Sequence, residues 1–339
     1  MPCGRRLRTL LVSFSAAVFW VQALFSQEPG CTERKLPVYF RDAQHLPISD
    51  ISVADLEAKV QGRPVKIVSL APDLRPGRLV LILDISGTMS GRVAKPSLWD
   101  LELSLASHFF ESNRRKATIA LLSFNDEIHD VIGFSEGNAA VGERLRQLMR
   151  DGSYGETQVK GKTALRDAIL QGIQLLDHPS SADAICVLTD GGDNASRKSV
   201  SDLEKRLAFT SVRLFSMLLY WRSRPGSSAP PEAINGPAEL VEITHKSGGE
   251  ILTAAQWNGK SVALSAGSKV SPAEMLNRLY QAITQRSLLE VELPAPISKN
   301  QRWELKLSST AQHRWKNATI TYPDTLISCN TEVYGTGRK

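Results

Sequence analysis

The sequence predicts a three-layer α/β/α domain with a mostly parallel central sheet, and small β-rich appendages at the N- and C-terminal ends. Between residues 76 and 287, apolar runs alternate with helical patterns, which is typical of strands joined by helices in a parallel sheet. Two of the runs, 79–83 and 184–188, lack polar alternation, which indicates strands buried on both faces. The flanking regions alternate apolar and polar residues instead, and this pattern indicates antiparallel strands.

The predicted elements follow in order along the chain. The N-terminal region, residues 31–75, is expected to hold strands at 36–40, 58–60 and 65–70, with a short helix or turn before the second strand and a linker at 71–77. In the central domain, residues 76–287, strands are expected at 79–83, 118–124, 131–134 (antiparallel, at the edge), 184–190, 212–219 and 250–254 (the final strand). Helices are expected at 97–113, 138–150, 163–176, 199–209, 238–247 and 272–285. The C-terminal region, residues 288–339, adds predicted strands at 289–293, 303–307 and 318–322.

Composition places the chain among soluble globular proteins. Its 339 residues exceed one average domain, and its contents of 42% hydrophobic and 22% charged residues are ordinary. The formal net charge of +6 invites a nucleic-acid interpretation. However, Arg5, Arg6 and Arg8 lie in a segment that we expect to be removed, and the remaining excess of cations is too small to favour nucleic acid.

Residues 1–26 have the organisation of an export signal. The basic stretch Arg5-Arg6-Leu7-Arg8 precedes an almost wholly apolar run at 9–25, and Val21-Gln22-Ala23 offers small residues where a signal peptidase needs them. The alternative is an uncleaved membrane anchor, although the run is shorter than the ~20 residues that usually span a bilayer. We therefore expect export to the periplasm or the cell exterior, with membrane association if the segment is retained.

Cysteine usage agrees with an exported protein. Cys186 lies in a predicted buried strand, where cysteine behaves as a small apolar residue. Cys31 and Cys329 lie near the two ends of the mature chain, and the termini of a domain are often close together. Since an oxidising compartment permits pairing, both a disulfide between these two residues and a pair of free thiols stay open.

The first central strand ends in three oxygen-bearing side chains at alternate positions. Asp84, Ser86 and Thr88 follow the apolar run, and Gly87 lets the backbone turn between them. A carboxylate and two hydroxyls gathered where a strand ends suit a hard divalent cation such as Mg²⁺, with Mn²⁺ or Ca²⁺ as alternatives. The competing interpretation is a helix N-cap, because Asp, Ser and Thr all cap helices well.

Two later segments favour the metal interpretation. Thr163 stands at the head of a predicted helix, and Asp190 ends the second buried strand. In open parallel sheets, ligands bind beyond the carboxyl ends of the strands, so both aspartates are expected at the same edge. In chain order, the set resembles the metal-ion-dependent adhesion site (MIDAS) of von Willebrand factor type A (VWA) domains: Asp84, Ser86, Thr88, Thr163 and Asp190. Thr88 stands where that family usually has serine.

The resemblance covers about residues 78–286 and implies a Rossmann-like VWA fold. It implies that the five residues hold the cation, with Asp190 acting through water, and that an open coordination position accepts an Asp or Glu carboxylate from a partner protein. The expected function is an exported protein-binding module for adhesion or scaffolding, and not an enzyme. The weaker alternative is a metal-assisted hydrolase that uses the same cation. The N-terminal region resembles that of a bacterial subgroup, the VWA-related domain first described in acidobacteria.

Other enzyme motifs are not found in the sequence. Gly161-Lys162-Thr163 matches the end of a nucleotide-binding P-loop, but Glu156 replaces the first glycine of that motif. Neither a Gly-x-Ser-x-Gly elbow nor a His-Glu-x-x-His pair occurs, and the six histidines have no zinc-ligand spacing. His108 is expected in the core, and Asp193 is expected either to cap the helix that follows it or to brace its own loop.

The predicted loops around the site carry more cations than acids. One interpretation is that these charges form a solvated rim around the site and serve only for solubility. The alternative is that they create a positive field that steers an acidic partner segment toward the cation. The cations are Arg92, Lys95, Lys160, Lys162, Arg197, Lys198, Arg222, Arg224, Lys260 and Lys269.

Overall fold

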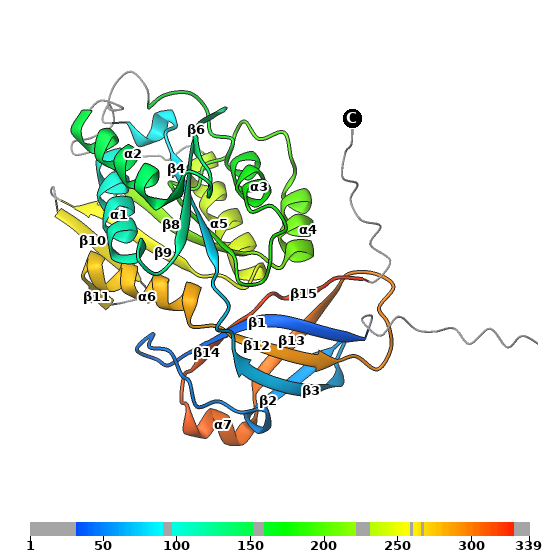
Figure 1. The fold of residues 1–339 in the computed structure, drawn as a ribbon. Helices are drawn as coiled ribbons and strands as arrows, with labels where there is room; N and C mark the ends of the chain where they lie inside the picture. The colour runs from blue at the N-terminus through cyan, green and yellow to red at the C-terminus, as the bar shows by residue number, and fades with distance from the viewer. Residues whose placement is uncertain are drawn as a thin grey trace, which may run out of the picture.

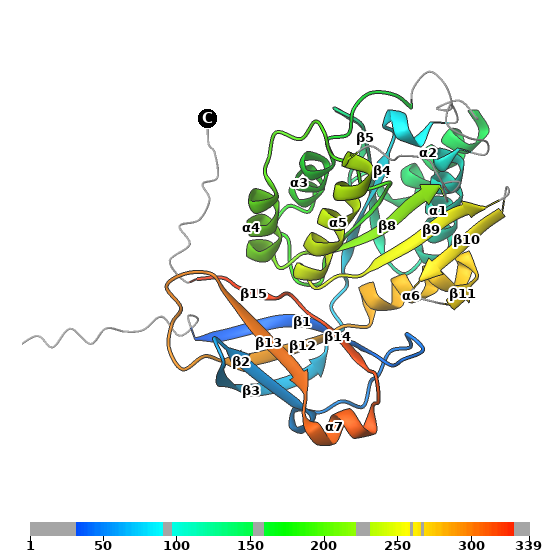
Figure 2. The same cartoon turned by 180° about the vertical axis from the view of Figure 1, so that it is seen from behind.

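The chain forms two β-sheets, a larger one and a smaller one (Figures 1 and 2). The computed structural model describes residues 32–90, 97–151, 159–221, 231–257, 260–265 and 268–328. The larger sheet lies between two layers of helices, and the smaller sheet adjoins one end of it. The expected export signal, Cys31 and Cys329 lie outside the described residues. Within the described ranges, no helix combines the length and the apolar character needed to cross a bilayer.

The larger sheet has eight strands in the order β11-β10-β9-β8-β7-β4-β5-β6. Its members are β4 (Arg78–Asp84), β5 (Thr118–Phe124), β6 (Ile128–Ile132), β7 (Ala184–Thr189), β8 (Arg213–Trp221), β9 (Ile251–Trp257), β10 (Lys260–Ser265) and β11 (Ser268–Val270). The strands from β9 to β5 pair in parallel, whereas β6, β10 and β11 are antiparallel to their neighbours. The sheet is therefore mixed, and the expected parallel arrangement describes only its centre.

Two predictions about the edges of this sheet are wrong. The edge strand β6 begins at Ile128 and not at 131, because a tight turn follows β5, in which Glu127 N donates to Asn125 Oδ1 (2.9 Å). Residues 260–265 and 268–270, which we expected in a loop, form the strands β10 and β11, so the strand at 250–254 is not the final one. The short apolar run Val262-Ala263-Leu264 is the local signal for the first strand of this hairpin.

Helices cover both faces of the larger sheet. One layer is α1 (Leu98–Asn113), α2 (Gly137–Asp151) and α6 (Pro272–Thr284), and the other is α3 (Leu165–Leu175), α4 (Val200–Thr210) and α5 (Pro231–Lys246). Along β4, Leu79, Leu81 and Leu83 pack into the core of the first layer, whereas Val80 and Ile82 pack into that of the second. This explains the uninterrupted apolar run, since each of these five residues enters one of two cores.

Serine side chains fix where three of the helices begin. Ser97 Oγ accepts a hydrogen bond from Asp100 N, and the Asp100 carboxylate accepts one from Ser97 N, which forms a capping box at the start of α1. Ser199 and Asp202 repeat this arrangement at α4, and Ser271 caps α6. The starts of these three helices were therefore predicted to within one residue. The predicted start of α5 at 238 is wrong, because that helix begins at Pro231.

His108 lies on the exposed side of α1, so the prediction of a core histidine is wrong. It shares a stripe of the helix with Ser104 and Glu111, which are also exposed. The buried stripe instead contains Leu105 and Phe109. One step along a helix turns the side chain by about 100°, which separates His108 from its apolar neighbour.

The smaller sheet unites the two ends of the chain. Its antiparallel order is β14-β1-β12-β3-β2-β13-β15. Its elements are β1 (Glu33–Arg41), η1 (Val53–Asp55), β2 (Leu56–Val60), β3 (Arg63–Pro72), β12 (Ser287–Glu292), β13 (Gln301–Leu307), α7 (Ser309–Arg314), β14 (Thr319–Thr321) and β15 (Thr325–Leu326). They bury a core of their own, which includes Val38, Leu289 and Trp303. Because β1 lies between β12 and β14, the N- and C-terminal appendages form one unit.

The smaller sheet lies where β4 begins, and so leaves the opposite edge of the larger sheet open. The chain passes from β3 through residues 73–77 into β4, and from α6 through 285–286 into β12. β4 therefore runs away from the smaller sheet (Figures 1 and 2). The carboxyl ends of β4, β5, β7 and β8 lie at the far edge, which is where ligands bind in open parallel sheets.

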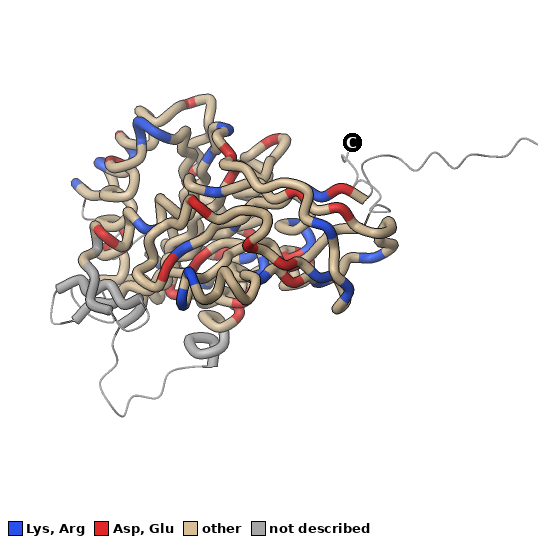
Figure 3. Tube along the Cα trace, turned by 90° about the horizontal axis from the view of Figure 1, so that it is seen from below, with Lys and Arg blue, Asp and Glu red and all other residues tan. Residues whose placement is uncertain are grey.

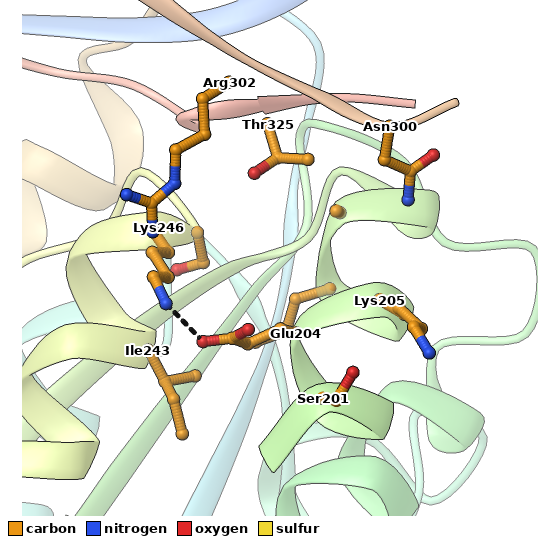
Figure 4. Close-up of a pocket in the computed structure, with 11 residues that line it drawn as sticks. Ser201, Glu204, Lys205, Ile243, Lys246, Asn300, Arg302 and Thr325 are labelled. Carbon is orange, nitrogen blue, oxygen red and sulfur yellow. Dashed lines mark hydrogen bonds and ion pairs between the residues drawn. The ribbon is translucent and has the colours of Figure 1, made fainter. Parts of the chain in front are cut away.

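A cleft of about 210 Å³ lies between α4, the end of α5 and the smaller sheet (Figure 4). Two of the cations that line it already have acidic partners. Lys246 Nζ lies 2.8 Å from Glu204 Oε1, and Arg302 Nε lies 3.6 Å from Asp324 Oδ2. Asp324 N also donates to the carbonyl of Lys246 (3.1 Å), which ties the smaller sheet to α5. The cleft therefore serves mainly as a junction between the two units.

A buried ion pair joins the two places where the chain crosses between the units. Arg286 Nε donates to Asp73 Oδ2 (2.9 Å), and Arg75 Nε donates to Asp73 Oδ1 (2.8 Å). The side chains of Asp73 and Arg286 are only 2% and 3% exposed. Asp73 N also donates to the carbonyl of Arg286 (3.0 Å), so the crossings are bonded through both main chain and side chains.

We expect Asp73→Asn to lower the free energy of unfolding by about 3 kcal/mol at pH 7, because Arg286 would be buried without its counter-charge. Hydrogen bonds from Arg75, together with the charge of Arg286, lower the pKa of Asp73 to about 2. This stabilisation is complete above the unfolded pKa of about 4 and is lost as the pH falls through about 2. Urea unfolding should therefore show a smaller difference between parent and variant at pH 3 than at pH 7.

Asp50→Asn is the matched control for this prediction. Asp50 pairs with Arg314 at 2.8 Å, but the side chains are 63% and 53% exposed. Its loss should cost less than about 1 kcal/mol at either pH. Equal destabilisation by the two substitutions would show that the junction pair contributes no more than a surface pair.

Candidate metal centre

Asp84 lies at the carboxyl end of β4 and is completely buried. Its carboxylate accepts two hydrogen bonds, one at Oδ1 from Ser86 N (2.8 Å) and one at Oδ2 from Thr189 Oγ1 (2.5 Å). Thr189 is the last residue of the neighbouring strand β7. The orientation of the carboxylate is therefore fixed by its own turn and by the adjacent strand.

The turn after β4 brings two hydroxyl groups together. Ser86 Oγ and Thr88 Oγ1 lie 3.2 Å apart. Ser86 is buried and Thr88 is exposed, so the pair leads from the buried carboxylate to the surface. Ser86 precedes the short 3₁₀ helix η2 (Gly87–Met89), but its side chain makes no capping hydrogen bond to that helix. The N-cap interpretation therefore does not account for the Ser86 hydroxyl.

The second loop, residues 159–164, is bonded to the first through the main chain. Lys160 N donates to the carbonyl of Ile85, and Gly87 N donates to the carbonyl of Gly161, both at 3.1 Å. Gly161 has a φ of 90°, a conformation that side chains other than glycine rarely adopt. Thr163 follows and is buried just before α3 begins.

The third loop begins at Asp190, directly after β7. Asp190 is partly buried, and its Oδ1 accepts a hydrogen bond from Gly192 N (3.0 Å). Asn194 in this loop joins it to the second loop, because Asn194 Oδ1 accepts from Thr163 N (2.9 Å). Helix α5 packs tightly against the same loop at Gly236. A Cβ at this position would lie 2.2 Å from the carbonyl oxygen of Gly191.

Asp193 braces the third loop and does not cap the helix that follows it. Its Oδ2 accepts hydrogen bonds from Arg166 N in the first turn of α3 (2.9 Å) and from Ser196 Oγ (2.8 Å). The following helix, α4, is capped by Ser199. Of the two roles that the sequence left open for Asp193, the structure therefore shows the brace.

The structure places the five predicted residues on three loops at one edge of the sheet. The groups of Asp84, Ser86 and Thr88 form a continuous chain of hydrogen bonds. The charge of Asp190 acts on Asp84, and Thr163 is bonded to the third loop, because its carbonyl accepts from Asn194 N and Ala195 N. The arrangement brings two carboxylates and three hydroxyl-bearing residues to the same end of β4 and β7.

Glu102 is a buried acid beside this site that the sequence analysis missed. It lies in α1 with 0% of its surface exposed, and its Oε1 accepts a hydrogen bond from Asp84 N (2.7 Å). Burial, and then the charge of Asp84, raise the pKa of Glu102 well above its ordinary range. Its position was the available signal, because it falls three residues from both Trp99 and Leu105, on the apolar face of the helix.

The oxygen groups at this edge suit a hard divalent cation. Burial, and then the charge of Asp190, raise the pKa of Asp84 to about 7, which shows that the protein alone does not offset the charge of these carboxylates. A cation would do so, and carboxylate and hydroxyl oxygens are ligands that Mg²⁺ and Ca²⁺ accept. Among the described residues, no group of three or more His, Cys, Asp or Glu is arranged to hold a metal, so a cation here would depend on the hydroxyls as well.

We expect Gly236→Ala to destabilise the protein by about 1–3 kcal/mol, although alanine is the better helix former. Its Cβ would meet the main-chain carbonyl of Gly191, which cannot rotate away as a side chain can. Gly172→Ala in α3 is the matched control, because its Cβ would meet the ends of apolar side chains and not main chain, with Ile82 Cδ1 the nearest at 2.9 Å. Urea unfolding of both variants tests this, and an equal or larger loss in Gly172→Ala would contradict it.

Residues 79–192, about a third of the chain, match the von Willebrand factor type A domain. No curated protein matches the chain. Among solved structures, an aerotolerance-related membrane protein from Bacteroides fragilis with multiple mutations to serines is 15% identical, covers 61% of this chain and 98% of its own, and has a TM-score of 0.42. BatB, a conserved hypothetical protein from Bacteroides thetaiotaomicron, is 12% identical over the same shares of the two chains, with a TM-score of 0.43. The PilB minor pilin from Streptococcus sanguinis is 14% identical over 63% of each chain, with a TM-score of 0.39.

Structural likenesses at this level carry no argument about function. The sequence match is independent of them, and it begins at the strand that ends in Asp84 and closes two residues after Asp190. The chain therefore contains a von Willebrand factor type A domain.

Proposed function

We propose that the chain is an exported, metal-ion-dependent protein-binding module for adhesion or scaffolding. A divalent cation at a MIDAS-type site would bind a carboxylate from a partner protein. One observation carries this proposal, the arrangement at the end of β4. The buried Asp84 carboxylate is followed there by the hydroxyls of Ser86 and Thr88, whose oxygens lie 3.2 Å apart, and the charge of Asp190 acts on it. The smaller sheet joins the opposite end of the strands and leaves this edge accessible.

The residues at the edge would share the work of holding and presenting the cation. Asp84, Ser86 and Thr88 would bind it, with Thr163 and with Asp190 acting through water. We expect Mg²⁺, with Mn²⁺ or Ca²⁺ as alternatives. Two aspartates balance the charge of the cation without making the site negative. The cation therefore still supplies a positive centre to which a carboxylate from outside can bind.

Exposed cations beside the site support an acidic partner segment. Lys160 and Lys162 on the second loop, and Arg197 and Lys198 on the third, are exposed and form no ion pair with a described residue. Such charges would speed the approach of an acidic segment. Of the other expected rim cations, four lie outside the described residues: Arg92, Lys95, Arg222 and Arg224.

The overall distribution of charge does not favour nucleic acid as the partner. Seen from below, Lys and Arg are interspersed with Asp and Glu along the chain (Figure 3). A long polyanion would require a continuous basic surface. We therefore propose a protein ligand that supplies a single Asp or Glu to the cation.

The location of the protein is proposed from its sequence alone. The basic stretch and apolar run of residues 1–26 support export, and retention of that run would hold the protein at a membrane. Membership of the acidobacterial-type subgroup and pairing of Cys31 with Cys329 stay predictions. Mass mapping of the mature protein without reduction decides both the cleavage and the pairing.

We expect the parent protein to bind one Mg²⁺ or Mn²⁺ in a calorimetric titration. Asp84→Ala and Asp190→Ala should weaken binding at least about 10-fold, because each removes a carboxylate from the site. Asp126→Ala is the matched control, since Asp126 is an exposed acid at the same edge outside the proposed set. Parent-like affinity in both site variants would contradict the assignment.

Thr88→Ser should bind the cation at least as tightly as the parent, because serine keeps the hydroxyl and lacks the extra methyl group. Thr88→Ala should bind the cation more weakly in the same titration, since the side-chain hydroxyl is removed. If the serine and alanine variants lose affinity to the same extent, Thr88 does not act through its hydroxyl. Turnover of a phosphoester or peptide that disappears in Asp84→Ala would support the hydrolase alternative.

A further inference from the structure

Glu102 occupies a position where an apolar residue would be expected. Helix α1 buries Trp99, Leu105 and Phe109 along the same side, and Glu102 is as buried as they are. Its Oε1 accepts the hydrogen bond from Asp84 N, whereas its Oε2 is buried with no hydrogen-bond partner among the described residues. A buried carboxylate oxygen without a partner destabilises the fold, so this acid is not explained by packing.

The amide of Asp84 donates its hydrogen bond at the point where β4 stops pairing with one of its two neighbouring strands. The pairing of β4 with β7 ends at Leu83 and Leu188, although its pairing with β5 continues to Asp84 and Phe124. At the last residue of the strand, the amide donates to a side chain from the helix layer. Asp84 is thus held at both ends, by Glu102 at its amide and by Ser86 and Thr189 at its carboxylate.

We propose that Glu102 is a positioning residue of the metal centre, which holds the main chain of Asp84 so that its carboxylate faces the hydroxyls of Ser86 and Thr88. This inference rests on the proposed function of the site. The role requires a hydrogen-bond acceptor at the position of Oε1 and does not require a negative charge. Glutamine can therefore supply it, whereas leucine cannot.

The test compares Glu102→Gln with Glu102→Leu in the full mature chain. In the metal-free protein, exchange of the Asp84 amide hydrogen, followed by NMR, should stay close to that of the parent in Glu102→Gln and become at least about 10-fold faster in Glu102→Leu. Titration with Mn²⁺ alone should show near-parent affinity for Glu102→Gln and an affinity at least about 10-fold weaker for Glu102→Leu. If Glu102→Leu does not fold, Glu102→Met keeps the side-chain length without the carboxylate.

Asn113→Leu is the matched control, because it also removes a buried polar group from α1. Asn113 Nδ2 donates to the carbonyl of Phe109 (2.6 Å) near the other end of the helix. The control should change stability without changing Asp84 exchange or Mn²⁺ affinity. If the role of Glu102 were merely structural, Glu102→Leu would also change stability but would leave Asp84 exchange and Mn²⁺ affinity unchanged.

Three results overturn the proposal. Parent-like exchange and affinity in Glu102→Leu would show that the hydrogen bond does not position Asp84. Equal loss of affinity in Glu102→Gln and Glu102→Leu would show that the charge is what matters. Fast exchange in Glu102→Gln would show that glutamine cannot replace the acceptor. A parent that binds no Mn²⁺ would instead contradict the proposed function, while amide exchange would still report on Glu102.

Discussion

Burial of the Asp84 carboxylate is the constraint on which the centre of the molecule depends. A charged group can be buried only where donors meet it, and here they come from the turn at Ser86 and from Thr189 on the next strand. Pairing of Leu83 with Leu188 brings Thr189 level with Asp84. A shift of one residue would send these side chains to opposite faces, so the site and the register of the sheet require each other.

The second unit leaves this edge accessible by occupying the other end of the strands. It gathers the N- and C-terminal segments into one sheet, and the pair of Asp73 and Arg286 fixes both crossings to the larger sheet. Arg213 reinforces the same end, because its guanidinium donates to the carbonyls of Ala282 and Ile283 at the end of α6. Asp73, Arg286 and Arg213 are thus bonded within the molecule. The opposite edge carries the exposed Lys160 and Lys162.

Local pattern was enough to predict the elements that are buried on both faces. β5 was predicted at 118–124 and found there, because its residues from Ile119 to Leu122, and then Phe124, enter one of the two cores and must be apolar. The prediction failed at the two edges of the larger sheet, at β6 on one side and at β11 with its neighbour β10 on the other. An edge strand has one free side, which relaxes that requirement. In the smaller sheet, Leu289 pairs with Leu36 and Leu70, more than 200 residues away along the chain, and no local signal encodes such a register.

The candidate site divides in the same way between local and distant information. Asp84, Ser86 and Thr88 are neighbours in sequence, so their convergence could be predicted from spacing. The contribution of Asp190 followed from the rule that parallel strands end at one edge. The main-chain bond from Lys160 to Ile85, and the hydrogen bond from Asp84 to Glu102, depend on tertiary packing and could not be predicted from periodicity.

Glu102 also bears on how the proposed centre could attract an acidic partner. Three ionised carboxylates around one divalent cation would leave a net negative site, which would oppose the approach of an outside carboxylate. The pKa of Glu102 is raised, so its neutral form is favoured and its main influence on Asp84 is the hydrogen bond to the amide. The balance then remains that of two aspartates and one cation, and the exposed lysines of the second loop add to the outward positive field. A third acid can therefore hold the site in place without cancelling the charge on which binding would rely.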